Sequence, residues 1–335
     1  MNCDFIPDVN TIKELSNLMP VIQRFPQLYR YLKLADYSID DIINNRISFS
    51  GIFEFNDLFD STFSPYKSES NMIEQIGLRY KNLEACAKMS GLSEMPISLE
   101  DYENTQKMIS SQKVKAGYRL LEQAGAFICC FSECNNDILM WSHYSDSNKG
   151  ICISFDFNKM PDDFGMRNAL HKINYQNNPS IIHSLYDDPG LVSPDVINAM
   201  FTKSNNWDYE KEWRMFVITN NDNANSQRVK ISFDFLPDEI CFGYHFLKNY
   251  FIYNNGDMAD KSKEIINLKN LLRYCVEKNI RTSMALPVIG KYQLRIKSIN
   301  TENLLSFIIR NFQNDKPQDI RYYYVVQDEL MTIIN

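Results

Sequence analysis

Glycine and proline are scarce in this sequence, with 11 Gly and 12 Pro among 335 residues. Disordered and loop-rich chains are usually rich in both, so this composition favours a folded globular protein. Long apolar runs are missing as well, and no stretch approaches the length of a membrane span. The segment Met1–Pro7 lacks a basic region followed by an apolar run, so it does not resemble a signal peptide. We therefore expect a cytoplasmic protein with no membrane partner.

The motifs of several common enzyme classes are also absent. No Gly-x-Gly-x-x-Gly follows a strand, and there is no Gly-x-x-x-x-Gly-Lys-Ser/Thr, so neither a Rossmann site nor a P-loop is supported. Neither Gly-x-Ser-x-Gly nor His-Glu-x-x-His occurs, which removes support for the usual hydrolases and zinc proteases.

Metal ligands and excess positive charge are lacking too. Cys130 and Cys134 could form one metal pair, but no second pair with suitable spacing follows, and the four histidines are dispersed. We predict no metal, and we expect reduced cysteines that pack in the core. The net charge of −7 provides no overall field for nucleic acid, although it leaves room for a local basic patch.

The spacing of apolar residues predicts a single α+β domain over residues 1–335, built on a mixed, largely antiparallel sheet. A helical insertion is predicted at 66–125, and a C-terminal extension of helix and strand at 260–335. Strands are predicted at 28–32, 46–50, 127–132, 151–156, 169–175, 209–218, 229–235, 239–244 and 291–296. Other helical segments are predicted at 10–24, 38–43 with Ser38 as N-cap, 135–144 (as a short helix or tight turn), 194–203 and 261–278.

The densest polar and aromatic block is Trp207-Asp208-Tyr209-Glu210-Lys211-Glu212-Trp213-Arg214, which holds two of the three tryptophans of the chain. If a strand begins near Tyr209, its alternation puts Glu210, Glu212 and Arg214 on one face. Charged groups at the mouth of a strand are often part of a site. In the alternative interpretation, they simply pair with charges on a neighbouring strand.

Three further polar-aromatic clusters are Tyr29-Arg30-Tyr31, Phe55-Asn56-Asp57 with Asp60, and Met140-Trp141-Ser142-His143-Tyr144. Each has a structural alternative. Arg30 could extend to a surface partner, and Asn56-Asp57 could cap a turn. Trp141, His143 and Tyr144 could be ordinary core or surface residues.

Taken together, these clusters resemble the bacterial domain-of-unknown-function family numbered 2971. The resemblance runs from about residue 27 to 250 and rests on residues 28–31, 55–60, 130–133, 139–150 and 207–214. The sequence departs from the family at Leu58, where Pro is usual, and at Asn148, where His is frequent. The resemblance implies a fold neighbourhood but no activity.

A more distant resemblance is to ADP-ribosyltransferase-like toxins, in which a strand with Arg or His, a short helix, a turn and a strand precede a site Glu at a strand start. Residues 28–50 and 207–218 follow that order. The resemblance implies a split sandwich that uses NAD⁺ as substrate, with Glu212, Glu210 and Arg30 as catalytic residues. Glu212 is favoured, because Arg214 on the same face would position it and keep it ionised.

The remaining residues of the expected site would bind the ligand. They are Tyr31, Asn56, Asp57, Trp141, His143, Tyr144, Trp207 and Arg214, and Tyr31, Trp141 or Tyr144 would stack on nicotinamide. The resemblance implies a bacterial toxin or phage-defence effector with an unknown protein or nucleic-acid target, and with a homo-oligomeric or defence-system partner. A non-catalytic module that binds a protein or nucleotide is one alternative. A metal-dependent nuclease that uses Asp57, Asp60, Glu210 and Glu212 is another.

Overall fold

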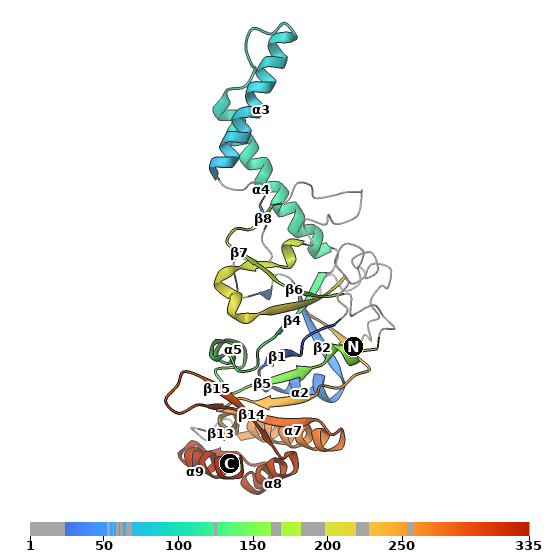
Figure 1. Cartoon of the computed structure of the whole chain (residues 1–335), viewed down its shortest axis with the longest axis vertical. Coiled ribbons are helices and arrows are strands. Elements are labelled where there is room, and N and C mark those ends of the chain that lie inside the picture. Colours follow the sequence, from blue (N-terminus) through green and yellow to red (C-terminus); the bar gives the residue numbers. More distant parts are fainter. Residues whose placement is uncertain are drawn as a thin grey trace.

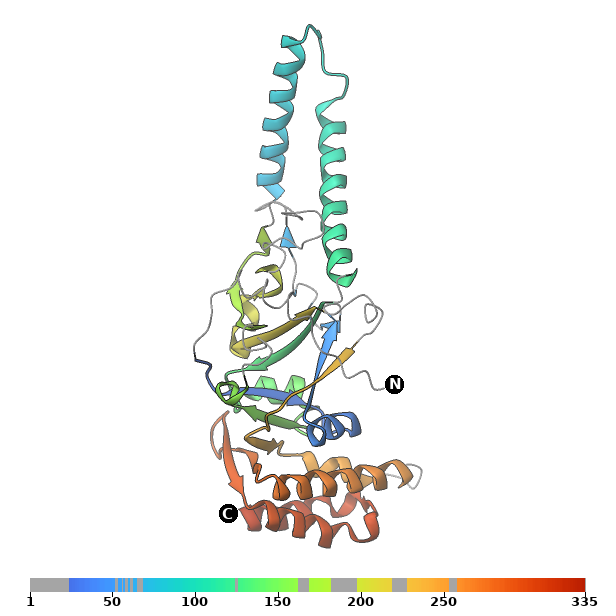
Figure 2. The ribbon, with the colours of Figure 1, turned by 90° about the vertical axis from the view of Figure 1, so that its right-hand side faces the viewer.

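The computed structural model describes residues 24–51, 54–55, 57, 60, 63–64, 69–123, 126–161, 169–181, 198–218, 228–252 and 258–334. It confirms the predicted α+β class and the largely antiparallel sheet. A helical hairpin, a central sheet and a layer of C-terminal helices follow one another along the longest axis (Figure 1, Figure 2).

The main sheet collects strands from nearly the whole described chain. Its order is β11 (Arg228–Ser232), β2 (Arg46–Gly51), β4 (Ala126–Ser132), β1 (Leu28–Leu32), β5 (Ile151–Phe155), β12 (Glu239–Phe242), β14 (Arg281–Pro287) and β15 (Leu294–Ile299). Off this path, β10 (Glu212–Ile218) pairs with β4, and β6 (Leu170–Lys172) pairs with β10. Among these described pairs, β12 and β14 are parallel and the others are antiparallel.

The sheet forks at β4. One edge of β4 is paired along its length with β10, from Glu212 opposite Ser132 to Ile218 opposite Ala126. Its other edge meets β1 at Ser132 and β2 at residues 127–128. Because β1 and β2 take opposite ends of this edge, a notch opens between them, and α2 (Asp36–Ile43) connects them.

Alternation along the strands separates apolar from polar side chains. In β10, Trp213, Met215 and Val217 enter the main hydrophobic core, so Glu212 and Arg214 face the other side of the sheet. In β1, Leu28 belongs to the same core, whereas Tyr31 packs in a smaller cluster with Trp141 on the opposite face. The face that carries Glu212 is therefore the face of Tyr31 and not that of Arg30.

Helices extend the fold at both ends. The antiparallel helices α3 (Glu69–Met89) and α4 (Leu99–Gln123) project from the sheet, inside the predicted insertion at 66–125 (Figure 2). In the C-terminal part, β14 and β15 extend the main sheet, while α7 (Met258–Glu277), α8 (Thr301–Asn311) and α9 (Tyr323–Ile334) form a layer beside it. None of the described helices combines the length and apolar composition of a membrane span.

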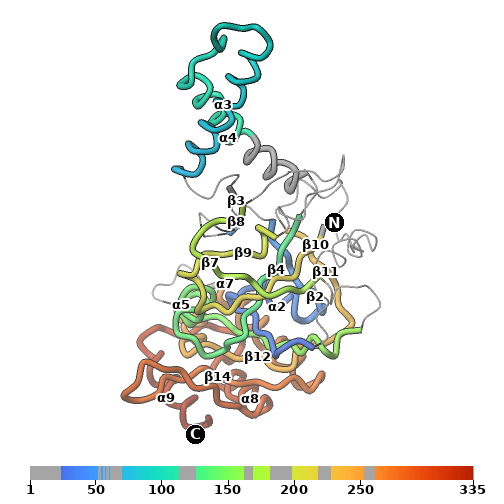
Figure 3. Tube along the Cα trace, turned by 45° about the horizontal axis from the view of Figure 1, so that its top comes forward, coloured from blue at the N-terminus to red at the C-terminus, as the bar shows by residue number. Residues whose placement is uncertain are grey.

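Smaller elements complete the architecture. The two-stranded sheets pair β3 (Phe63–Ser64) with β8 (Ser180–Ile181), β7 (Asn174–Gln176) with β9 (Thr202–Ser204), and β13 (Phe251–Ile252) with β16 (Gln318–Asp319). Figure 3 shows the first two between the helical hairpin and the main sheet. In the part of the chain that the structure describes, the short helices are α5 (Ile138–Tyr144), η2 (Phe157–Lys159), η4 (Asn205–Glu210), η6 (Phe246–Tyr250), η8 (Gln313–Asp315) and η9 (Ile320–Tyr322).

Several predicted boundaries are wrong. Helix α2 begins two residues before Ser38, and its N-cap Ala35 provides no side-chain hydrogen bond. The segment predicted as one strand at 169–175 is split into β6 and β7, which pair with different strands. The helix predicted at 194–203 has ended by Met200, because β9 occupies Thr202–Ser204. Apart from Arg24, the predicted helical region 10–24 lies outside the described residues.

The strand predicted from Tyr209 begins instead at Glu212. Residues Asn205–Glu210 form the 3₁₀ helix η4, and Lys211 follows in the left-handed region at φ 45°. Glu210 is therefore not a strand residue. This turn, rather than strand alternation, determines where its side chain points.

Candidate functional site

Arg214 is the centre of a buried ion-pair cluster. Its guanidinium is fully buried and binds both carboxylate oxygens of Asp60, at 2.7 and 2.6 Å. Its Nε donates to Glu212 at 2.6 Å, and Nη1 also donates to the Met200 carbonyl. The planar fork of arginine suits two carboxylates at once, and this arrangement fixes both acids.

Lys203 is the second cation of the cluster. From β9, its Nζ donates to Glu210 at 2.6 Å and to Glu212 at 2.9 Å, and it lies 3.7 Å from Asp60. It also lies 5.1 Å from the centre of the Trp207 ring. Lys203 was not among the predicted site residues, because residues 194–203 were predicted as a helix and the pairing of β7 with β9 that presents Lys203 is not visible in the sequence.

Glu210 reaches the cluster from the end of η4. Tyr144, the last residue of α5, donates a hydrogen bond of 2.6 Å to its Oε1, while Lys203 holds Oε2. Helix α5 is fixed at its start by Asp137, whose side chain accepts from the amides of Leu139 and Met140. A capped helix therefore positions the tyrosine against the carboxylate.

Burial and charge act differently on the two glutamates. Burial disfavours the ionised form of Glu212, but Arg214 and Lys203 outweigh it and lower the pKa of this carboxyl to about 2. Burial raises the pKa of Glu210 in spite of the attraction of Lys203. In the described part of the cluster, two cations face three carboxylates, counting Asp60. Of the two glutamates, Glu210 is therefore the one that more readily takes up a proton.

A cavity of about 110 Å³ opens beside Glu210. Its polar lining includes Asp60, Lys203, Glu210, Glu212 and Ser132, and its other lining residues are Tyr29, Tyr31, Phe55, Cys130, Phe131, Met140 and Tyr144. The oxygens of Glu212 already accept two bonds from Arg214 and one from Lys203, and the amide of Glu212 donates to the Tyr175 hydroxyl. One partner of Glu210 is the neutral hydroxyl of Tyr144. A ligand would replace this hydroxyl at a lower cost in free energy than the Arg214 guanidinium bound to Glu212.

The structure does not bring Arg30 into this cluster. Arg30 lies on the other face of β1 and lines a different cavity, which shares Tyr31 and Tyr144 with the first. The two cavities therefore adjoin at these tyrosines. The expected use of Arg30 together with Glu212 in one compact site remains a prediction that the side-chain directions do not favour.

The other predicted ligand-binding residues have varied positions. Trp141 is fully buried, donates from Nε1 to the Asn135 carbonyl and packs edge-on against Tyr31. His143 is exposed, with Nδ1 3.5 Å from the Tyr209 hydroxyl. Asp57 lines neither cavity, and Asn56 lies outside the described residues.

The acidic cluster does not resemble a nuclease metal site. The described residues contain no group of three or more His, Cys, Asp or Glu side chains arranged to hold a metal ion. Lys203 and Arg214 occupy the space between Asp60, Glu210 and Glu212. A divalent cation would have to displace two buried positive charges.

Comparison with known proteins gives one family resemblance. Neither the curated proteins nor the solved structures gave a match. A family model described as a protein of unknown function (DUF2971) matches residues 140–215, which is less than a quarter of the chain. The matched segment contains Tyr144, Lys203, Glu210, Glu212 and Arg214. The predicted resemblance to this family is thereby confirmed, and it covers four of the five charged residues of the cluster.

Proposed function

We propose that this chain cleaves the N-glycosidic bond of NAD⁺, as an ADP-ribosyltransferase or NAD⁺ glycohydrolase, and that Glu210 rather than Glu212 is the acting carboxylate. The observation that carries the proposal is the Glu210 side chain, held by Tyr144 and Lys203 beside a cavity with aromatic walls, whose volume of about 110 Å³ suits the nicotinamide end of NAD⁺ and not the whole dinucleotide. Glu212 then has a positioning role, because its oxygens are occupied by Arg214 and Lys203.

The chemistry needs a carboxylate near the nicotinamide ribose. The bond between C1′ and the nicotinamide nitrogen breaks, the electron pair leaves with nicotinamide, and positive charge develops on the ribose ring. A carboxylate that accepts a hydrogen bond from a ribose hydroxyl stabilises that charge, as in glycoside cleavage. Water or a target nucleophile then bonds to C1′ and loses a proton. Tyr29 or Tyr31 could pack against the nicotinamide ring.

Nicotinamide release from NAD⁺ tests the proposal. We expect the unmodified protein to release nicotinamide, and Glu210→Gln to reduce the rate by roughly a hundredfold or more without loss of the folded state. Glu277→Gln, the same change at an exposed position at the end of α7 and away from the cavity, is the matched control and should keep the wild-type rate. Absence of both nicotinamide release and NAD⁺ binding by calorimetry would refute the proposal. The bacterial toxin or phage-defence setting, with its unknown target, remains part of the proposal.

A non-catalytic binding module is the second candidate. The closed ion-pair cluster favours a non-catalytic role, because buried charges that are paired with one another are less available to take part in a reaction. This alternative predicts that NAD⁺ or another nucleotide binds without turnover. It also predicts that Glu210→Gln changes binding but has no activity to abolish.

A further inference from the structure

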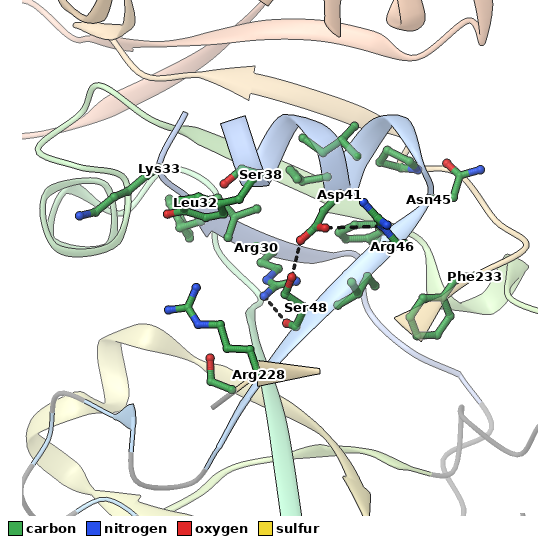
Figure 4. Close-up of a pocket in the computed structure, with 18 of the residues that line it drawn as sticks. Arg30, Leu32, Lys33, Ser38, Asp41, Asn45, Arg46, Ser48, Arg228 and Phe233 are labelled. Carbon is green, nitrogen blue, oxygen red and sulfur yellow. Dashed lines mark hydrogen bonds and ion pairs between the residues drawn. The ribbon is translucent and has the colours of Figure 1, made fainter. Parts of the chain in front are cut away.

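A second cavity, of about 300 Å³, lies in the notch between β1 and β2 (Figure 4). Helix α2 contributes one wall, β1 and β2 contribute two others, and Arg228 enters from β11. Its volume is at the lower end of the range for ligand pockets and is too small for a macromolecule.

The charge of this cavity is opposite to that of the chain. Its lining includes the cations Arg30, Lys33, Arg46 and Arg228 but the single carboxylate Asp41, whereas the whole chain has a net charge of −7. Positive charges that line a concave surface raise the local concentration of an anionic ligand.

The one carboxylate is already neutralised by its own partners. Asp41 accepts from Lys230 at 2.6 Å and from the Ser48 hydroxyl, and Arg46 lies 3.7 Å away. Arg46 is held mainly by Asp40. Asp41 therefore does not compensate the positive charges of Arg30, Lys33 and Arg228.

Arg30 and Arg228 have no carboxylate partner among the residues that the structure describes. Arg30 is half-buried and spans the notch, where it donates to the Ser48 carbonyl at 2.6 Å (Figure 4). This contact holds the guanidinium in place and leaves further N–H groups for a ligand, since arginine has five. Arg228 is exposed and lines the same cavity from the neighbouring strand.

Ser38 provides an independent sign of a ligand. This residue lines the cavity and is 1% exposed, and its Oγ has no hydrogen-bond partner among the described residues. A buried hydroxyl without a partner is costly, and a bound oxygen atom would satisfy it. It lies in the first turn of α2, where the helix dipole also favours negative charge.

One part of the lining is apolar and consists of Ile153, Phe155, Phe233, Phe235 and Pro237. We propose that this cavity binds a small organic phosphate of the size of a nucleoside monophosphate, with Arg30, Arg228 and Ser38 around the phosphate and the phenylalanines against the organic part. Guanidinium groups and hydroxyls are the usual ligands of phosphate oxygens. This site is distinct from the chemistry proposed at Glu210 and does not depend on it.

Calorimetric titration with nucleoside monophosphates tests the site. We expect AMP, CMP, GMP or UMP to bind, and the matching uncharged nucleoside and inorganic phosphate to bind at least tenfold more weakly. Arg30→Gln and Arg228→Gln should each weaken binding by roughly tenfold to a hundredfold, and Ser38→Ala by a smaller factor. Added NaCl should weaken binding in the wild type.

An arginine outside the cavity provides the control. Arg273→Gln removes an exposed arginine of α7, and this variant should bind the monophosphate as the wild type does. Thermal melting checks that each variant is folded. Failure of all four nucleotides to bind in the millimolar range, or wild-type binding by Arg30→Gln, would overturn the site. Binding of inorganic phosphate as tightly as AMP would overturn the role of the apolar wall.

Discussion

The cavities on the two faces of β1 differ in whether their charged side chains are paired with opposite charges. Beside Glu210, every charged side chain of the described cluster has partners of opposite charge, and Arg214 is completely buried. In the notch between β1 and β2, Arg30 has a carbonyl as its partner and remains half-buried. An arginine whose charge is matched inside the protein supports structure, whereas one held in place but unmatched is available to a ligand.

The largest expected effect comes from removing the buried arginine. Arg214→Met leaves Asp60 and Glu212 without their main partner, and we expect it to lower the free energy of unfolding by about 3–5 kcal/mol. Arg30→Met should cost less than about 1.5 kcal/mol, because it removes one hydrogen bond at a partly exposed position. Urea denaturation of both variants measures the difference. Equal losses would show that the two arginines do not differ in role.

The pH dependence of stability sharpens the same contrast. Because the folded-state pKa of Glu212 is about 2, below its ordinary value of 4.5, its ionised form stabilises the fold above about pH 4.5. This contribution should disappear as the pH falls toward 2, and it is on the order of 3 kcal/mol. In Glu212→Gln, we expect a less stable protein at neutral pH and a flatter decline below pH 4.5. Thermal melts across this range provide the measurement, and an unchanged slope would contradict the assignment.

The smallest of the three effects is the coupling between Lys203 and Glu210. Their 2.6 Å contact is buried, so Lys203→Met and Glu210→Gln should not be additive. We expect the double variant to be about 1–3 kcal/mol more stable than the sum of the single losses predicts. Denaturant unfolding of the four proteins completes the cycle. A coupling near zero would indicate that Lys203 serves only Glu212 and Asp60.

Much of the fold follows from local patterns, and much of the site does not. Strands such as β1, β2 and β4 were predicted within a residue or two, because alternation or a short apolar run marks them. Glu210 and Glu212 were predicted to lie on one face of a strand. In the structure, Lys211 between them has a left-handed backbone, and both carboxylates accept hydrogen bonds from the ammonium group of Lys203. Nothing in a two-residue spacing distinguishes these geometries.

Long-range pairings account for the other differences. Lys203 enters the cluster through the parallel pairing of β7 with β9, and Asp60 reaches Arg214 across 154 positions of sequence. Arg30 was grouped with the glutamates through the resemblance to ADP-ribosyltransferase-like toxins, but its neighbours Tyr29 and Tyr31 occupy the face toward Glu210. If the pairing of β1 with β4 had been known, strand alternation would have placed Arg30 on the face opposite to Glu212.

The projecting hairpin of α3 and α4 has a consequence for the order of folding. Strands β2 and β4 pair with each other although the whole hairpin separates them in sequence. Closing so long a loop is entropically costly if its chain is unstructured. Helix contacts are local and form quickly, and the two antiparallel helices return the chain to the side of the molecule from which it left. Early formation of the hairpin therefore shortens the effective loop between β2 and β4. Strand β4 can then pair with β2 soon after β4 is synthesised.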